Sequence, residues 1–375
     1  MADSSLAGSM REVENLRGLR FVHDVAHVTI DRADLKDRIR DQMTKTMSYS
    51  TDDFAVILKA LQLVDTGKSS DLIASMLKLY ESQVLAFYDP LSHTYYSIRN
   101  DGSQPADAGD PGTMADAVEI HELTHAMQDQ RFDAGTRDLA LMRDTDAGMA
   151  YHSLLEGEAS VVMLAYVLGK DRVSLENVAK NEAMVNQMTN ATASADKSID
   201  PATPRYFMQS LMFPYAAGMK LVLEAYRRGG WGLVNRMDEN PPRSTREVIH
   251  YNEYFSRLDH KPGDIPPFDA QPQGGVANPL TVEHLGEFHW RYLVGDGPSF
   301  GWVDDHVTIA QNEHCQPTVL VETKWQDAKQ AHAFREAYVA FLRKRGVEPL
   351  VAFGAGTTVR VAYGVDDALM EQFVQ

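Results

Sequence analysis

The sequence predicts an α+β protein in which a mostly helical domain with a β-hairpin is followed by a small α+β unit. Three observations lead to this fold class. Apolar residues recur at helical spacing through much of the first 250 residues, two β-rich runs flank a turn near residue 90, and the tail alternates short β-rich runs with an amphipathic helix. Residues 262–280 are rich in Pro and Gly, which indicates a linker between two domains. We predict a first domain at 11–261, this linker, and a second domain at 281–375.

The first domain is predicted to be built mainly from helices. Apolar spacing and capping residues predict helices at 32–43, 51–63, a segment that starts after Ser69 or Ser70, 114–132, a segment from Asp144 or Asp146 to Gly169, 205–228 with an interruption near Pro214, and 245–250. Residues 83–88 and 94–98 are the two arms of the predicted hairpin. Residues 100–111 and 170–204 show neither the helical nor the strand spacing of apolar residues and are predicted to be irregular.

The tail has the pattern of a separate small unit. Strands are predicted at 306–309, 318–322, 350–353 and 358–362, and helices at 281–294, 327–345 and 365–374. After the first of these helices the order is ββαββα.

Overall composition narrows the classes of partner. The 375 residues are 44% hydrophobic and 24% charged, and 36 Lys and Arg stand against 53 Asp and Glu, for a formal net charge of −17. This balance argues against nucleic acid as a partner. No apolar run approaches the length that spans a bilayer, and the single cysteine, Cys315, excludes a disulfide framework within the chain.

One stretch carries a chemical signature, His121-Glu122-Leu123-Thr124-His125. On a helix, residues four apart leave the same face one turn apart, so His121 and His125 can bind one metal ion. Glu122 lies beside them and can take a proton from a water molecule that the metal activates. The predicted cofactor is Zn²⁺, for which two imidazoles and one carboxylate form a common catalytic site.

The third ligand is expected on the next long helix, where Glu156-Gly157-Glu158-Ala159 interrupts a strongly apolar run. Two residues apart on a helix, Glu156 and Glu158 cannot both face one metal ion. Gly157 would let neighbouring helices approach closely. His152 lies one turn before Glu156 and could line the same site.

These pieces resemble the gluzincin metallopeptidases, in which the Glu before the Gly is the third ligand. The resemblance assigns Glu156 to the metal and implies a zincin-like fold and peptidase activity. A closer resemblance is to an uncharacterised bacterial group of predicted zinc proteases. It covers residues 85–255 and rests on Phe87-Tyr88-Asp89-Pro90, His121 to Gln130, Glu156 to Ala159, Phe213-Pro214-Tyr215 and Pro242-Arg243-Ser244-Thr245. The aminopeptidase signature Gly-x-Met-Glu-Asn and the third His of metzincins are absent from the sequence.

Four further assignments are expectations with alternatives. Asp129, one turn beyond His125, could hold a ligating imidazole or lie at the surface. Tyr215 and His250 are candidates to donate a hydrogen bond to the transition-state oxyanion, or could be a packed tyrosine and a surface histidine. The hairpin before the metal-binding helix could pair with substrate backbone, or could be an ordinary hairpin.

The function we predict is zinc-dependent hydrolysis of peptide bonds, with Glu122 as general base and a peptide or protein as substrate. The alternatives are a zincin scaffold that binds metal or a partner without turnover, and an enzyme held latent by its own tail or loop. Residues 1–10 look like an added leader, so an export signal could have been removed, and both an exported and a cytoplasmic location stay open. No feature of the sequence sets an oligomeric state.

Overall fold

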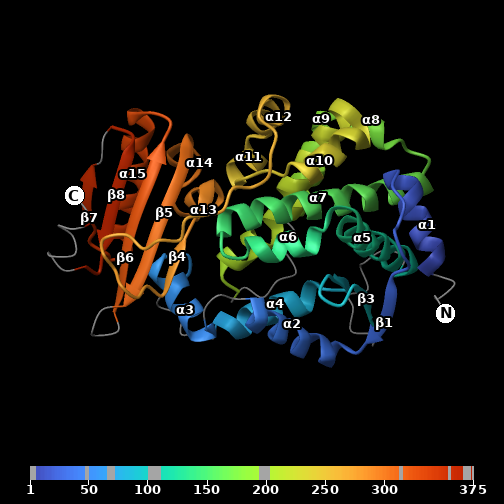
Figure 1. The fold of residues 1–375 in the computed structure, drawn as a ribbon, viewed down its shortest axis with the longest axis horizontal. Helices are drawn as coiled ribbons and strands as arrows, with labels where there is room; N and C mark the ends of the chain where they lie inside the picture. Colours follow the sequence, from blue (N-terminus) through green and yellow to red (C-terminus); the bar gives the residue numbers. More distant parts are fainter. Residues whose placement is uncertain are drawn as a thin grey trace.

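The computed structural model describes residues 6–46, 50–65, 72–99, 111–193, 203–311, 316–353, 356–365 and 373. Across these ranges the chain is mixed α+β and mainly helical, with one three-stranded and one five-stranded sheet. The predicted α+β class is therefore confirmed. Figure 1 shows the larger sheet at one end of the molecule and most of the helices at the other. None of the described helices combines the length and the apolar character needed to cross a membrane.

Twelve helices precede the linker in the described part of the chain. They are α1 (Leu6–Arg17), α2 (Arg32–Thr46), α3 (Thr51–Ala60), α4 (Leu72–Gln83), α5 (Pro111–Phe132), α6 (Ala134–Leu141), α7 (Thr145–Lys170), α8 (Leu175–Lys180), α9 (Glu182–Ala193), α10 (Arg205–Glu239), α11 (Thr245–Ile249) and α12 (Tyr251–His260). Several begin where the sequence places a cap. Ser50 accepts a hydrogen bond from the backbone N–H of Asp53, and Asp144 accepts one from Ala147, so these side chains satisfy N–H groups that the first helical turn leaves free.

The three-stranded sheet lies against α5, the helix that carries His121 and His125. Its strands are β1 (Ala26–Ile30), β2 (Ala86–Asp89) and β3 (Thr94–Ile98), in the order β1-β3-β2. Strands β2 and β3 form the predicted antiparallel hairpin, and β1 pairs with β3 in parallel. Strand β2 is consequently an edge strand, and it lies next to α5.

The five-stranded sheet forms the C-terminal unit. Its strands are β4 (Thr281–Glu283), β5 (Trp302–Gln311), β6 (Pro317–Trp325), β7 (Leu350–Phe353) and β8 (Thr358–Tyr363), in the order β4-β5-β6-β8-β7 with antiparallel neighbours. The associated helices are α13 (Gly286–Val294), α14 (Asp296–Ser299) and α15 (Ala328–Lys344). The four strands and the helix predicted between residues 306 and 362 are all present.

A shared hydrophobic core joins this sheet to the early helices. Ile57 and Leu58 of α3 are buried in the same cluster as Val321 of β6 and Tyr338 of α15. The Tyr363 hydroxyl also donates to the carbonyl of Ala60 at 2.9 Å. Figure 1 shows α3 beside the sheet, far along the chain from it. The C-terminal unit is therefore completed by helices that precede the metal motif.

Three predicted segments differ from the structure. Residues 170–204, predicted to be irregular, contain α8 and α9, because Leu175, Ala179 and Val185 are buried in the core formed with α10. Pro214 lies inside α10 without interrupting it; the backbone leaves helical geometry at Gly229 and Gly230 and then continues to Glu239. The helix predicted at 281–294 is divided into β4 and α13, since Thr281–Glu283 pairs with β5.

The predicted leader at residues 1–10 lies partly in a helix, and other predicted segments lie outside the described residues. Residues 6–10, interpreted as part of an added leader, belong to α1, and Leu6 and Met10 are buried in the core formed with α5. The irregular segment at 100–110, the helix starts at Ser69 or Ser70, and most of the helix at 365–374 lie outside the described residues.

Candidate metal centre

Helices α5 and α7 pack against each other and bring three potential ligands together. His121 and His125 come from successive turns of α5, and Glu156 comes from the middle of α7. His121 Nε2 lies 3.1 Å from both His125 Nε2 and Glu156 Oε2, and His125 Nε2 lies 3.6 Å from the same oxygen. Among the described residues, these three form the one group of His, Cys, Asp or Glu whose geometry could hold a metal ion.

The spacing fits a tetrahedral site. Zinc binds His nitrogen and carboxylate oxygen at about 2.0–2.2 Å, and two ligands at a tetrahedral angle are then about 3.3–3.6 Å apart. The observed separations are 3.1, 3.1 and 3.6 Å, so one lies in this range and two are slightly shorter. The side chains of His121, His125 and Glu156 are 9%, 17% and 8% exposed, so the site is enclosed but reaches solvent. Two imidazoles and one carboxylate at this spacing could hold a zinc ion.

Charge in the site is balanced between the ligands. Burial acts against the charged carboxylate of Glu156, but His125 and a hydrogen bond from His121 outweigh it and hold the pKa of Glu156 well below its usual range. Burial likewise opposes the charged form of His125, yet Glu156 outweighs it and raises the pKa of His125 to about 9. The cluster therefore attracts a cation, and a proton and a metal ion would compete for it.

Glu122 lies on the side of the cluster that faces strand β2. Its Oε2 accepts a hydrogen bond of 2.9 Å from the backbone N–H of Tyr88. Burial is the main cause that raises the pKa of Glu122 above its usual range. A buried carboxylate with a raised pKa, beside residues that could hold a metal ion, is suited to accept and return a proton.

Gln128, and not Asp129, holds an imidazole of the cluster. His125 Nδ1 lies 2.8 Å from Gln128 Oε1. Asp129 instead accepts hydrogen bonds from the Tyr88 hydroxyl at 2.7 Å and the Gly135 backbone N–H at 3.0 Å, and its Oδ2 lies 2.9 Å from His93 Nδ1. It ties the hairpin to α5 and α6. Sequence reasoning missed Gln128, although a residue three positions after a helical ligand is the nearest neighbour that can reach its ring.

Tyr215 reaches the cluster because α7 and α10 approach closely. A Cβ on Gly157 would lie 2.3 Å from the backbone of Gly218, and one on Gly218 would lie 1.9 Å from the carbonyl oxygen of Ser153. Gly157 thus permits a close helix crossing, and the partner is α10. Tyr215, one turn before Gly218, packs against His121 with ring centroids 6.1 Å apart. Burial, followed by the charges of Glu156 and Glu122, raises the pKa of Tyr215 well above its usual value, so its hydroxyl remains a donor.

His250 lies at the junction between the helical part and the C-terminal unit. Its Nε2 is 2.7 Å from Glu287 Oε1 of α13, and its ring meets Phe300 edge-on. None of the contacts described for His250 involves the metal cluster. Its role as an oxyanion donor stays a prediction.

His152 stands at the outer side of Glu156. Its Nε2 lies 3.3 Å from Glu156 Oε1, the oxygen that does not face His121, and its Nδ1 lies 4.0 Å from Asp138. The side chain is 45% exposed. His152 can hold Oε1 and thereby leave Oε2 for a metal ion.

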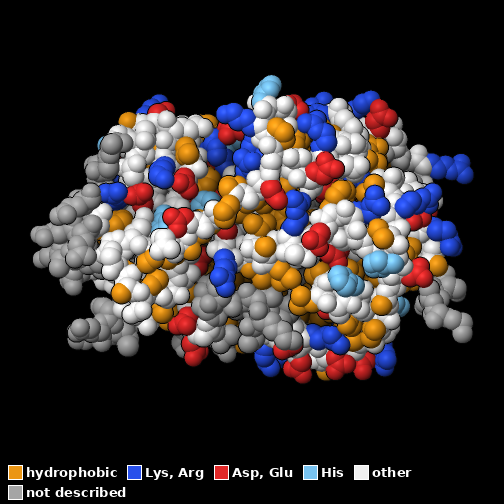
Figure 2. Space-filling view, in the orientation of Figure 1, with side chains coloured by type: hydrophobic (Ala, Val, Ile, Leu, Met, Phe, Trp, Pro, Cys, Tyr) orange, Lys and Arg blue, Asp and Glu red, His pale blue; other side chains and the backbone are white. Residues whose placement is uncertain are grey.

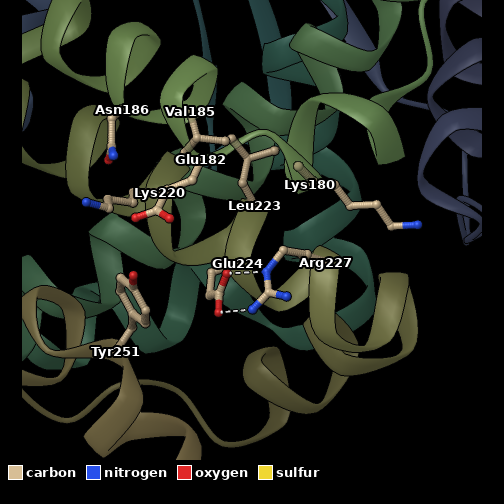
Figure 3. Close-up of a pocket in the computed structure, with 10 residues that line it drawn as sticks. Lys180, Glu182, Val185, Asn186, Lys220, Leu223, Glu224, Arg227 and Tyr251 are labelled. Carbon is tan, nitrogen blue, oxygen red and sulfur yellow. Dashed lines mark hydrogen bonds and ion pairs between the residues drawn. The ribbon is translucent and has the colours of Figure 1, made fainter.

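A surface pocket lies apart from the metal cluster. One lies between α8, α9, α10 and α12, and Figure 3 shows Arg227 bonded to Glu224 within it, with Lys220 and Glu182 at its wall. None of its lining residues belongs to the metal cluster. On the face drawn in Figure 2, basic and acidic side chains are interspersed, and hydrophobic side chains gather toward the middle.

Comparison with known proteins concerns mainly the C-terminal unit. A family model described as a domain of unknown function (DUF8575) matches residues 271–372. The match covers β4 to β8 and leaves out α5 and α7, which carry the metal cluster. No curated protein and no solved structure matches the chain. The similarity that is shown is therefore between residues 271–372 and that domain family.

Proposed function

We propose that this protein is a zinc-dependent peptidase on a zincin-like, gluzincin-type scaffold. The observation that carries the proposal is the triangle of His121, His125 and Glu156, with Glu122 beside it. The donor set of two imidazoles and one carboxylate suits zinc. The resemblance of the motif and of the Glu-Gly-x-Ala stretch to gluzincins supports the same assignment.

A zinc ion held by the three ligands would lower the pKa of a water molecule and polarise the scissile carbonyl. Glu122 would accept the proton of the attacking water as the water oxygen bonds to the carbonyl carbon. When the C–N bond breaks, Glu122 returns the proton to the leaving amine. The Tyr215 hydroxyl, kept protonated by its surroundings, donates to the carbonyl oxygen as negative charge develops there.

Strand β2 offers a place for the substrate backbone. In an antiparallel pair, alternate residues direct both N–H and C=O away from the partner strand. The N–H of Tyr88 points to Glu122, so its C=O also faces outward at this edge. An extended peptide could add to β2 there and lie across the cluster.

The experiment measures metal content and peptide hydrolysis together. Zinc per chain is determined by elemental analysis, and cleavage of a labelled unfolded protein is followed by mass spectrometry. We expect about one zinc per chain, retained in Glu122→Gln while the cleavage rate falls roughly 10²–10⁴-fold. His125→Ala should lose zinc and activity.

Other outcomes separate the alternatives. Zinc with no cleavage, before and after limited proteolysis, would mean a metal-binding scaffold without turnover. Cleavage that starts after proteolysis would mean a latent enzyme. Full activity in Glu122→Gln would refute the proposed general base.

A further inference from the structure

Glu158 is a buried carboxylate that the proposed reaction does not use. It lies two residues after Glu156, faces away from the cluster, and its side chain is 1% exposed. A buried carboxylate is costly unless it is paired and hydrogen-bonded. Its partners include the Nε of Arg17 and the Nε2 of Gln128, the latter at 2.8 Å, and the buried carboxyl of Asp238, whose pKa burial and then the charge of Glu158 raise.

The contacts of Gln128 fix the orientation of its amide. Its Nε2 donates to the Leu155 carbonyl at 3.0 Å and to Glu158 Oε2. A backbone carbonyl accepts only, and a carboxylate paired with a guanidinium accepts only. The amide nitrogen must therefore face α7, and Oε1 must face His125.

The fixed amide in turn selects one tautomer of His125. Because Gln128 Oε1 can only accept, His125 Nδ1 must carry the hydrogen of the 2.8 Å bond between them. The lone pair of the neutral ring is then on Nε2, the atom that faces His121 Nε2 and Glu156 Oε2. A metal ligand needs this lone pair on the metal side.

Arg17 supplies the positive charge from a different helix. It ends α1, its side chain is fully buried, and its guanidinium lies 4.7 Å from the centre of the Trp231 ring. Its Nη2 donates to Asp238 at 3.2 Å. Helix α1 packs on α5 and α7, which places Arg17 against Glu158.

We propose that Arg17, Glu158 and Gln128 form a positioning relay that holds His125 in its metal-binding tautomer, so that α1 is part of the support of the metal centre. The proposal rests on the metal site proposed above. Arg17 and Glu158 act through Gln128 and His125, because their described contacts include none of the three ligands.

The test compares metal affinity in full-length variants. Zinc affinity is measured by competition with a chromophoric chelator, and coordination by the visible spectrum of the Co²⁺ form. Glu158→Gln keeps the shape but lets its own amide face Gln128 either way. Gln128→Met removes the hydrogen bonds at similar volume. We expect both to bind zinc about 10–100-fold more weakly and to alter the Co²⁺ spectrum, with the circular dichroism unchanged.

The role of Arg17 is tested in a double variant that removes its positive charge and the negative charge of Glu158 together. Arg17→Met alone would leave Glu158 unpaired and could unfold the protein, so Arg17→Met is combined with Glu158→Gln. If Arg17 acts through Glu158, the double variant should bind zinc no more weakly than Glu158→Gln. A further tenfold loss in the double variant would refute the relay.

The control is a similar carboxylate elsewhere. Glu287, 2% exposed and 3.2 Å from Arg246, is bonded across the C-terminal junction. Glu287→Gln should leave zinc affinity unchanged; an equal loss would mean that the effect of Glu158→Gln is general loosening. Wild-type protein without zinc binding would overturn the metal site itself, whereas unchanged affinity in Glu158→Gln and Gln128→Met would overturn the relay alone.

Discussion

The carboxylate of Glu122 and the backbone N–H of Tyr88 are joined by a hydrogen bond of 2.9 Å. The same tyrosine donates its hydroxyl to Asp129 at 2.7 Å, so one residue of β2 contacts α5 at two points about two turns apart. The edge strand and the proposed general base are therefore positioned together.

The first prediction concerns this double attachment. Tyr88→Phe removes the hydroxyl bond to Asp129 and should lower the free energy of unfolding by about 1–2 kcal/mol, because Asp129 is a mostly buried acceptor. We expect cleavage to slow as well, since β2 is less firmly held. Urea denaturation and cleavage kinetics measure the two effects. Tyr166→Phe, which removes a more exposed 3.4 Å bond to Asp116, is the matched control and should change stability by less than about 0.5 kcal/mol.

The second prediction concerns the crossing of α7 and α10. Gly157→Ala would place a Cβ 2.3 Å from the backbone of Gly218, which cannot move without separating the helices. We expect a loss of about 1–3 kcal/mol or more in unfolding free energy, together with slower cleavage as Tyr215 moves from Glu156. Gly169→Ala lies in the same helix with no atom within 4 Å of the new Cβ, and should stabilise by up to about 1 kcal/mol. Equal stability of the two variants would contradict the described packing.

The third prediction concerns the pH dependence of the C-terminal junction. Burial opposes the charged form of His284, but a hydrogen bond to Asp144 and the carboxylates of Asp305 and Asp146 outweigh it and raise the pKa of His284 to about 10. A folded-state pKa above the unfolded value of about 6.5 gives stability that is fully present below pH 6.5 and is lost as pH rises toward 10.

Urea denaturation at several pH values between 7 and 10 measures this linkage. One fully linked proton gives a slope of about 1.4 kcal/mol per pH unit. His284→Gln should flatten the slope, whereas His332→Gln, at a 55% exposed side chain of α15, should leave it unchanged. Parallel curves for wild type and His284→Gln would refute the assignment.

The fourth prediction concerns the domain boundary. A fragment of residues 271–375 keeps the region that matches the domain family but lacks Ile57, Leu58 and Leu61, which are buried in the core of its sheet. Hydrogen exchange should show less protection of the amides in β5, β6 and β8 in the fragment than in the full chain. Protection equal to that of the full chain would show that the unit is independent of α3.

The local parts of this architecture could be predicted from the sequence. Residue spacing sufficed for the hairpin, the capped helices and the His121–His125 pair, because these depend on neighbours within a few positions. The packing of α8 and α9 could not be predicted, since their polar composition hides the few residues, such as Leu175 and Val185, that the core buries.

The candidate site shows the same limit. Glu156 was assigned by resemblance, and the structure brings it to the two histidines. Asp129 was a candidate partner of His125, with a surface role as the alternative. The partner is Gln128, because the choice depends on what α7 presents to α5, namely Leu155 and Glu158. The role of Arg17, 141 residues from Glu158, has no local signal.

The core shared by α3 and the C-terminal sheet also constrains the order of folding during synthesis. Ala60 and Tyr363, which are hydrogen-bonded, are 303 residues apart. At about 5–20 residues per second, roughly 15 to 60 s separate their emergence from the ribosome. The apolar face of α3 can pack against α4 early, but it must wait through that interval for the strands of the C-terminal sheet, so this core is completed only after Tyr363 has been made.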